Sequence, residues 1–351
     1  MKNLLRLLLK SQHQQNRSKA SETEKGMTLV ELLVGSIMAF LIITPMLGFV
    51  VDMLNTDRRE QVKSNTEQDI QAAVDFIAQD LSQAIYIYDN IGTSTLVNGQ
   101  FIPTPANETP ILVFWKRQQL NNSLPIAAND PKDCGTVPCN DTYVLSLVAY
   151  YQVSGGPGIW CQPSGDPNTC PTRIVRRQIQ DGLRNPANST LPNPADRYFT
   201  VAQLGTRSGG LRPSDAFNIG TVGQPGFDIS NPTQNVTIAN AAWNPGDVLV
   251  NYIDHTNPGP PSTQCTTALG NPTTQVGTAT QPIAENQLKI HNSNSSSFYT
   301  CVDTQRNLAR VTIRGNSLRR LQTNGADYDD KKSAFFPTAS VQVQGLGARG
   351  N

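Results

Sequence analysis

The sequence contains few of the residues and motifs from which catalytic and metal sites are usually built. It has only three histidines among 351 residues, and no two cysteines have the C-x-x-C spacing of zinc and thiol-redox sites. The Gly-x-Ser-x-Gly, Walker and His-Glu-x-x-His motifs are also missing. We therefore expect neither enzyme activity, nor a cofactor, nor a metal site.

An excess of charge of one sign is missing too, because 28 Lys+Arg are set against 27 Asp+Glu. The balance is uneven along the chain. Residues 1–26 hold six basic and two acidic side chains, and the remaining residues hold 22 basic and 25 acidic ones. Non-specific nucleic-acid binding depends on a basic surface. The body of the chain is therefore a poor candidate for a nucleic-acid partner.

Charge is almost absent from residues 27–51, where Glu31 is the single charged side chain. About 20 apolar residues in a helix suffice to cross a membrane. No small-residue cleavage site of a secretory signal follows this run. The basic residues 1–26 precede it and favour a cytoplasmic N-terminus. The sequence therefore predicts a single-pass membrane protein with a cytoplasmic N-terminus and an exported C-terminal domain.

Six cysteines follow the apolar run, and an exported location favours disulfides over free thiols. Pairing of neighbours in the sequence would join 134 with 139, 161 with 170 and 265 with 301. Six cysteines allow many other connectivities, so the pairing stays open. The candidates are Cys134, Cys139, Cys161, Cys170, Cys265 and Cys301.

The position of Glu31 inside an apolar run needs an explanation. A charged side chain at the centre of a membrane span costs about 2.5–3.5 kcal/mol on insertion scales. Glu31 could lie near the end of the span and reach the interface. The alternative is a cationic partner, and no lysine or arginine lies between Thr28 and Asp57. That partner would then be a chain terminus or part of another chain.

The segment KGMTLVE, from Lys25 to Glu31, resembles the class III signal of type IV pilins and pseudopilins. The resemblance implies that residues 1–26 are a leader, which prepilin peptidase removes by cutting after Gly26. The same enzyme would methylate the new N-terminus at Met27. Glu31 would become the fifth mature residue and pair with the terminal amine of a neighbouring subunit during assembly. An ion pair in a low-dielectric bundle is far stronger than one in water.

The segment AAVDFIAQDLSQAI, residues 72–85, resembles a helix of the larger minor pilins, namely J-type pseudopilins and PilW-like minor pilins. The long leader and loop-rich body look most like cyanobacterial minor pilins, including the hormogonium polysaccharide secretion pseudopilins. The resemblance implies a structural or priming subunit of a filament that serves polysaccharide secretion and gliding motility. Its partners would be prepilin peptidase, other pilins, and the inner-membrane assembly platform with its ATPase.

Two other functions compete with this interpretation. One is a pilus-associated adhesin or DNA-uptake receptor that uses the loops, and the other is a membrane-anchored exported binding domain outside any filament. Tyr150, Tyr151 and Trp160, with the nearby arginines 173, 176 and 177, could contact a polysaccharide or DNA, or could be core residues and a charged outer face. The acidic segment 324–332 could bind calcium, but a solvated turn is favoured because the EF-hand spacing is absent.

Beyond residue 51 the pattern is typical of an amphipathic helix. We predict one nearly continuous helix over 27–88, of which 27–51 is the transmembrane or filament-core part, followed by an exported β-rich domain over 89–351. Pro45 and Gly48 both weaken a helix, which favours local melting in a filament. The apolar stripe comprises Ile70, Val74, Ile77, Leu81, Ala84, Ile85 and Tyr88. The polar positions are Asp69, Asp75, Gln79, Asp80 and Gln83.

The exported domain has strand-like runs between long turn-rich segments. A long helix followed by strands predicts an α+β fold in which the helix packs on an antiparallel β-sheet, as in type IV pilins. The predicted loops are 89–110, 118–141, 181–246 and 255–300. The predicted strands are Ile111–Lys116, Thr142–Val153, Thr172–Gln180, Asp247–Asp254, Leu308–Arg314 and Ala339–Gln344.

Overall fold

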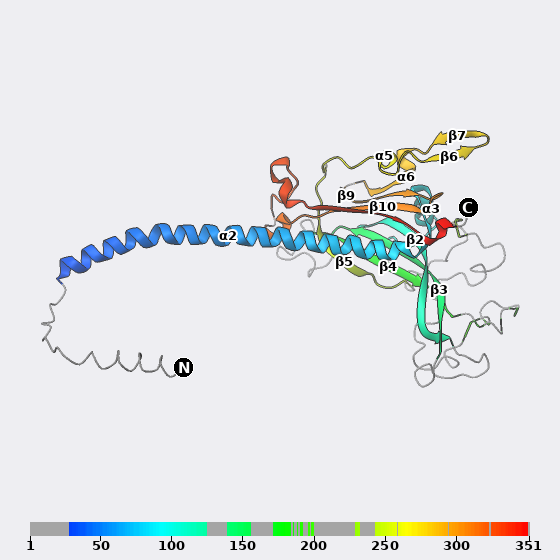
Figure 1. The fold of residues 1–351 in the computed structure, drawn as a ribbon, viewed down its shortest axis with the longest axis horizontal. Coiled ribbons are helices and arrows are strands. Elements are labelled where there is room, and N and C mark those ends of the chain that lie inside the picture. The colour runs from blue at the N-terminus through cyan, green and yellow to red at the C-terminus, as the bar shows by residue number, and fades with distance from the viewer. Residues whose placement is uncertain are drawn as a thin grey trace, which may run out of the picture. The chain divides into compact units, whose positions relative to one another are not determined.

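A computed structural model gives the fold of the chain as two compact units, Met1–Arg58 and Arg59–Asn351. Helix α2, Leu29–Ser82, contributes residues to both units (Figure 1). The structure describes residues 28–124, 139–155, 171–183, 243–257, 259–293, 295–322 and 324–349, with short pieces between 185 and 231.

In the first unit, the described residues form the apolar part of α2. The helix passes through Pro45 without a break, and the hydroxyl of Thr44 donates a hydrogen bond to the carbonyl of Phe40 at 2.8 Å. Its large apolar side chains are all exposed, from Leu29 to Leu54. By length and composition this helix could cross a membrane or act as a signal sequence. The prediction of a long apolar N-terminal helix is confirmed.

In the second unit, the last turns of α2 bury one face. Ile70, Val74, Ile77 and Leu81 are each at most 1% exposed, as their helical spacing predicts. The predicted end of the helix at Tyr88 is wrong, because α2 ends at Ser82 and Ala84–Ile87 form strand β1. The apolar residues of this segment fit a helical and an extended pattern equally well. Pairing of this segment with strand β2 stabilises the extended form.

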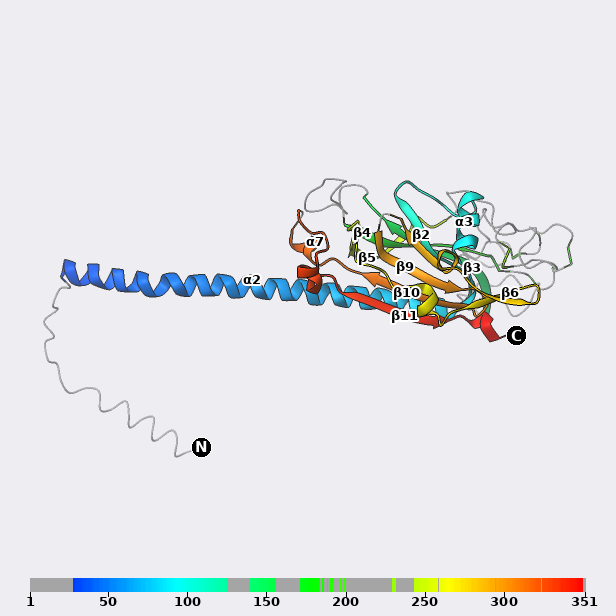
Figure 2. The ribbon, with the colours of Figure 1, turned by 90° about the horizontal axis from the view of Figure 1, so that it is seen from above.

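The described residues of the second unit form two antiparallel sheets and a short hairpin (Figures 1 and 2). The five-stranded sheet has the order β1-β2-β3-β4-β5, with β2 Glu108–Leu124, β3 Asn140–Val153, β4 Thr172–Gln180 and β5 Asp247–Ile253. The four-stranded sheet has the order β11-β10-β9-β8, with β8 Lys289–Asn292, β9 Ser295–Asp303, β10 Leu308–Arg314 and β11 Thr338–Gln344. The hairpin joins β6 Thr273–Val276 to β7 Ala279–Pro282. The α+β class is thus confirmed.

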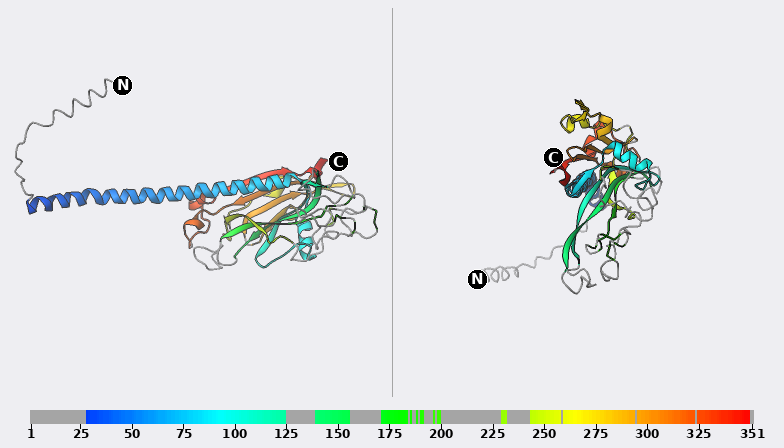
Figure 3. Two further views of the ribbon diagram at one scale, coloured as in Figure 1. Left: turned by 90° about the horizontal axis from the view of Figure 1, so that it is seen from below. Right: turned by 90° about the vertical axis from the view of Figure 1, so that its right-hand side faces the viewer.

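Short helices connect the strands along the chain, and one more follows the last strand (Figure 3). They are α3 Asn90–Asn98, α5 Cys265–Ala268, α6 Glu285–Leu288, α7 Leu318–Leu321 and the 3-10 helices η8 Asp330–Phe335 and η9 Leu346–Arg349. Three predicted loops are therefore wrong in whole or in part. The segment 118–141 holds the end of β2, which runs to Leu124, and the start of β3 at Asn140. The segment 89–110 contains α3, which starts where Asp89 accepts a hydrogen bond from the Gly92 amide at 2.8 Å. The segment 255–300 contains two helices, the hairpin, β8 and most of β9.

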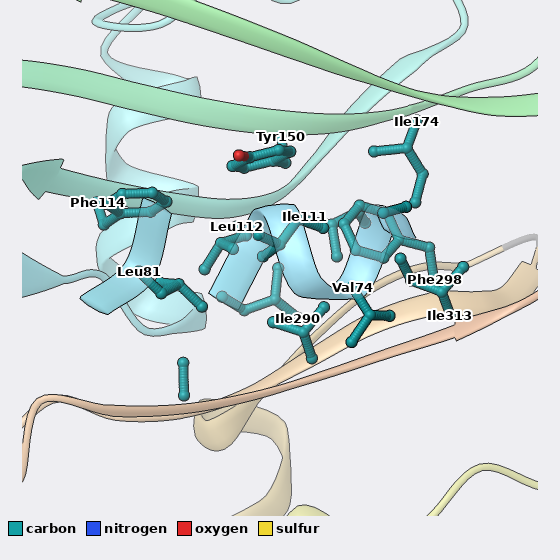
Figure 4. Close-up of a cluster of buried hydrophobic side chains, with 14 of the residues drawn as sticks. Val74, Leu81, Ile111, Leu112, Phe114, Tyr150, Ile174, Ile290, Phe298 and Ile313 are labelled. Atoms are coloured by element: carbon teal, nitrogen blue, oxygen red, sulfur yellow. The ribbon is translucent and has the colours of Figure 1, made fainter. Parts of the chain in front are cut away.

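The main core of the second unit lies where α2 meets both sheets (Figure 4). It joins Val74 and Leu81 of the helix to Phe114 and Tyr150 of the first sheet and Phe298 of the second. The Phe114 and Tyr150 rings stack with their centroids 6.3 Å apart. Because this apolar face of α2 contacts both sheets, the helix end is an integral part of the β-rich domain.

Candidate functional site

The first candidate site is the N-terminal end of α2. Gly26 and Met27, the predicted processing residues, and the predicted leader 1–26 lie outside the described residues. Thr28 precedes the helix, and its carbonyl accepts a hydrogen bond from the Leu32 amide at 3.1 Å. The Thr28 hydroxyl accepts a hydrogen bond from the Glu31 amide at 3.3 Å. Thr28 therefore occupies the N-cap position of α2, and Glu31 lies in its first turn.

The Thr28-x-x-Glu31 spacing is that of a capping box, which the sequence reasoning did not consider. The structure shows one bond of that motif, from the Glu31 amide to the Thr28 hydroxyl. A carboxylate in the first turn is also favoured by the helix dipole. Neither effect neutralises the charge of Glu31, which therefore still favours a cationic partner when the helix is in an apolar environment.

The apolar surface that follows Glu31 is extensive. Leu29 is 88% exposed, and Phe40 and Phe49 are each 71% exposed. A continuous apolar surface of this kind is typical of contact with lipid or with other helices. Among the described residues of this unit, the basic side chains begin at Arg58. The described part of the unit therefore offers Glu31 no cation within the apolar segment.

A second candidate site is a buried ionic cluster around Asp80. Lys116 Nζ lies 2.6 Å from Asp80 Oδ1, and Arg176 Nε lies 2.7 Å from Asp80 Oδ2. The Tyr150 hydroxyl donates to Oδ2 at 2.7 Å. Asp80 is only 6% exposed, so its predicted place on the polar face is wrong. The partners come from β2, β3 and β4, which means that Asp80 joins the helix end to three strands.

The electrostatics of this cluster keep Asp80 ionised. Burial acts to raise the pKa of Asp80, but the hydrogen bond and charge of Arg176, together with Lys116, outweigh burial and hold the pKa below its ordinary value. Burial and the adjacent Asp80 charge raise the pKa of Tyr150 well above its ordinary value. The tyrosine therefore remains a neutral hydrogen-bond donor. With every oxygen of Asp80 bonded to a partner, the cluster serves packing and orientation.

Of the two alternatives for these aromatic and arginine residues, the tyrosines follow the one in which they are core residues. Tyr150 and Tyr151 are fully buried, and the Tyr151 hydroxyl donates to the Pro103 carbonyl at 2.8 Å. Arg177 donates to both carboxylate oxygens of Glu108, at 2.9 and 3.0 Å.

Two further arginines of this group also form bonds within the chain. Arg173 is 7% exposed and donates to the Gly155 carbonyl at 2.6 Å, while Arg176 bonds Asp80. Trp160 lies outside the described residues. Tyr150 and Tyr151 are thus interior residues whose rings are not available for stacking on a ligand, and the three arginines are buried or half-buried and bonded within the chain.

Two of the six predicted disulfide cysteines form a bond with each other. Cys265 and Cys301 are joined with a Cα–Cα distance of 5.2 Å, which is the pairing of neighbours in the sequence. Cys139 is also disulfide-bonded. Cys134, Cys161 and Cys170 lie outside the described residues. The Cys265–Cys301 bond attaches α5 to β9 of the four-stranded sheet.

The acidic segment 324–332 forms turns and the start of η8. Asp327 Oδ1 lies 3.3 Å from His255 Nε2, and the Asp329 side chain accepts a hydrogen bond from the Lys331 amide at 2.9 Å. These carboxylates point to different partners. Within the described segments, no three His, Cys, Asp or Glu side chains come together in a way that could hold a metal ion.

Comparison of the chain with protein-family models, curated proteins and solved structures gives no match in any of the three. The family resemblance therefore rests on the residues of the chain itself.

Proposed function

We propose that this chain is a minor pilin or pseudopilin, a structural or priming subunit of a filament that assembles from the inner membrane. The observation that carries the proposal is a helix that begins with a single carboxylate, Glu31, in its first turn and continues as a long exposed apolar surface. It directly follows the sequence Lys25-Gly26-Met27-Thr28. The narrower role in polysaccharide secretion and gliding motility belongs to the same proposal and rests on the resemblance alone.

The energetics of Glu31 favour assembly over simple anchoring. A bare carboxylate in the apolar layer costs about 2.5–3.5 kcal/mol on insertion scales. Cleavage after Gly26 would give each subunit a terminal amine at the edge of the same apolar helix. Bundled helices could then pair the amine of one subunit with Glu31 of another. Because an unpaired charge is costly, this pairing would favour the register between subunits in which each Glu31 meets an amine.

The apolar segment and the β-rich unit share helix α2. Because α2 is one helix from Leu29 to Ser82, the apolar segment is continuous with the turns that bury Ile70, Val74 and Ile77. Asp80 adds bonds to three strands at the far end of the helix. A subunit incorporated through its apolar helix therefore has its β-rich domain attached through both packing and ion pairs.

Mass spectrometry of the N-terminus of the membrane-extracted protein tests the processing step. The expected mature chain begins at Met27 and carries one methyl group on its amine. An intact Met1, or a cut anywhere other than after Gly26, would contradict the proposal.

The substitution Glu31→Gln tests the assembly step. The glutamine keeps the size of the side chain and removes its charge, so we expect normal membrane insertion and a loss of filament incorporation. Glu67→Gln is the matched control, because Glu67 is an exposed carboxylate farther along α2. Insertion and assembly at wild-type levels in Glu31→Gln would favour a membrane-anchored domain outside any filament.

A further inference from the structure

The outer face of the four-stranded sheet has a cavity of about 380 Å³. Strands β9, β10 and β11 form its floor, because alternate residues of a strand point to the same face. Tyr299, Thr312 and Ser340 are directly opposite one another in the strand register. The intervening residues, such as Val311 and Ile313, lie in the core on the opposite face. Arg310, Arg314 and Thr338 complete the floor.

One wall of the cavity is the segment 260–263, which precedes the disulfide at Cys265. The Thr263 amide donates a hydrogen bond to the Tyr299 hydroxyl at 3.2 Å. The Ser296 hydroxyl donates to the Pro260 carbonyl at 3.5 Å. These bonds, and the disulfide a few residues away, hold the wall against the sheet.

The other wall comes from the segment around η8. It contributes Tyr328, Ser333 and Phe336. The rings of Tyr328 and Phe336 pack edge to face with centroids 5.1 Å apart, and the Tyr328 amide donates to the Thr256 hydroxyl at 2.7 Å. The cavity is therefore a fixed trough between two anchored segments.

Two arginines lie in the floor of this trough. Arg314 Nε donates to Asp254 Oδ2 at 2.9 Å, whereas its Nη2 is buried with no hydrogen-bond partner among the described residues. Arg310 donates to the Ser340 hydroxyl at 3.4 Å and has no ion pair within the described segments. A buried donor without an acceptor points to a place where a further oxygen atom can bind.

The remaining lining is rich in hydroxyl groups. Ser262, Thr263, Ser296, Ser333 and Ser340 offer hydroxyls that can both donate and accept. The aromatic side chains Tyr299 and Phe336 are buried, at 4% and 5% exposure, and shape the cavity beside these hydroxyls. Small-molecule sites are mostly apolar with a few polar groups. This lining instead suits a ligand that itself carries several hydroxyls and a negative charge.

We propose that this trough binds a hydroxylated carboxylate of the uronic-acid type, as a free sugar acid or as a unit of an acidic glycan. The carboxylate binds the Arg310 and Arg314 guanidinium groups, whose forked donors match its two oxygens. The sugar hydroxyls exchange hydrogen bonds with the serine and threonine side chains. The inference does not depend on filament assembly, because the sheet and its walls belong to the β-rich unit alone.

Calorimetric titration of the purified full chain in uncharged detergent micelles tests the proposal with glucuronate as the probe. We expect saturable binding of glucuronate that is clearly tighter than that of glucose, which lacks the charge, or of acetate and inorganic phosphate, which lack the sugar hydroxyls. Absence of saturable glucuronate binding would overturn the proposal. Binding of glucose, acetate or phosphate as tight as that of glucuronate would overturn it as well. An oligomer of glucuronate that binds more tightly than the single unit would identify a glycan as the source.

Variants of the trough give the second test. Arg310→Gln, at a partly exposed position, should weaken glucuronate binding about tenfold, as expected for loss of a charged hydrogen-bond donor, and Arg310→Lys should restore part of it. Arg117→Gln is the matched control, because Arg117 is an exposed arginine that packs on the Tyr143 ring of the other sheet. Binding by Arg310→Gln as tight as that of wild type, with an unchanged unfolding transition, would also overturn the proposal.

Discussion

Two carboxylates on the same helix have opposite surroundings. Glu31 lies in the first turn of α2 among side chains that are all exposed. Asp80 lies in its last turn, where it is 6% exposed and bonded to Lys116, Tyr150 and Arg176. The end with Asp80 completes its interactions within the chain. The end with Glu31 has an apolar surface and a charge that need partners from outside.

This difference assigns separate roles to the two ends of the helix. Substitutions near Asp80 should change the free energy of unfolding of the β-rich domain. Substitutions in the apolar segment should leave that free energy unchanged and act on insertion or assembly instead. Substitutions at the two ends of α2 therefore test this division.

The largest expected effect is that of Asp80→Asn. The asparagine has nearly the same shape but leaves Lys116 and Arg176 buried without a countercharge, which typically costs about 3–5 kcal/mol. Denaturant unfolding of the full chain in uncharged micelles, followed by tryptophan fluorescence, measures the change. Asp75→Asn is the control, because Asp75 is exposed and accepts a hydrogen bond only from Gln71, at 3.0 Å, among the described contacts. A loss no larger than that of the control would show that the buried cluster is not important for stability.

The pH dependence of stability gives a second test of Asp80. Its folded pKa is lowered from the ordinary value of 3.8, so the folded state favours the ionised form. The resulting stabilisation is present above pH 3.8 and is lost as the pH falls through the folded pKa. We expect the stability difference between wild type and Asp80→Asn to shrink as the pH is lowered below this value. A difference that stays constant across this acid range would contradict the assigned ionic role.

These surroundings of Asp80 mark the limit of what the sequence could predict. Local periodicity placed Ile70, Val74 and Ile77 correctly, because burial of a helix stripe depends on residues three or four positions apart. The strand-like sequence patterns also predicted β4 and β10 at their observed bounds. Asp80 fits a polar face by the same criterion. Its partners lie 36, 70 and 96 residues away along the chain, so only the folded arrangement reveals that it is buried.

The missed strands have a related explanation. In β9 the serines Ser295 and Ser297 are buried, and a run of serines looks like a loop in the sequence. Pairing with β10, which brings Phe298 opposite Ile313, determines that it is a strand. The trough on the four-stranded sheet was missed for the same reason, because its arginines, tyrosines and serines come from five separate segments. The predicted processing motif can be recognised without such contacts, since its residues are contiguous in the sequence.

A smaller effect on stability is expected from Gly315→Ala. A Cβ atom at Gly315 would lie 2.9 Å from Thr66 Cγ2, and closer still to the end of Ile70, so the added methyl group has no room. Overpacking of this kind typically costs about 1–3 kcal/mol. The same unfolding measurement detects it. An unchanged midpoint would show that α2 can shift against the sheet more easily than its buried stripe indicates.

The smallest effect, and the one of opposite sign, is expected from Gly35→Ala. A Cβ at Gly35 would meet no other atom within 4 Å, and alanine in a helix interior is favoured over glycine by about 0.5–1 kcal/mol. The substitution should therefore slow amide hydrogen exchange around residue 35 in the purified chain, while the unfolding midpoint of the β-rich domain stays unchanged. Faster exchange, or a lower midpoint, would mean that this segment already packs on the body. In that case the apolar helix would not be free for a partner, and the division of α2 between Glu31 and Asp80 would fail.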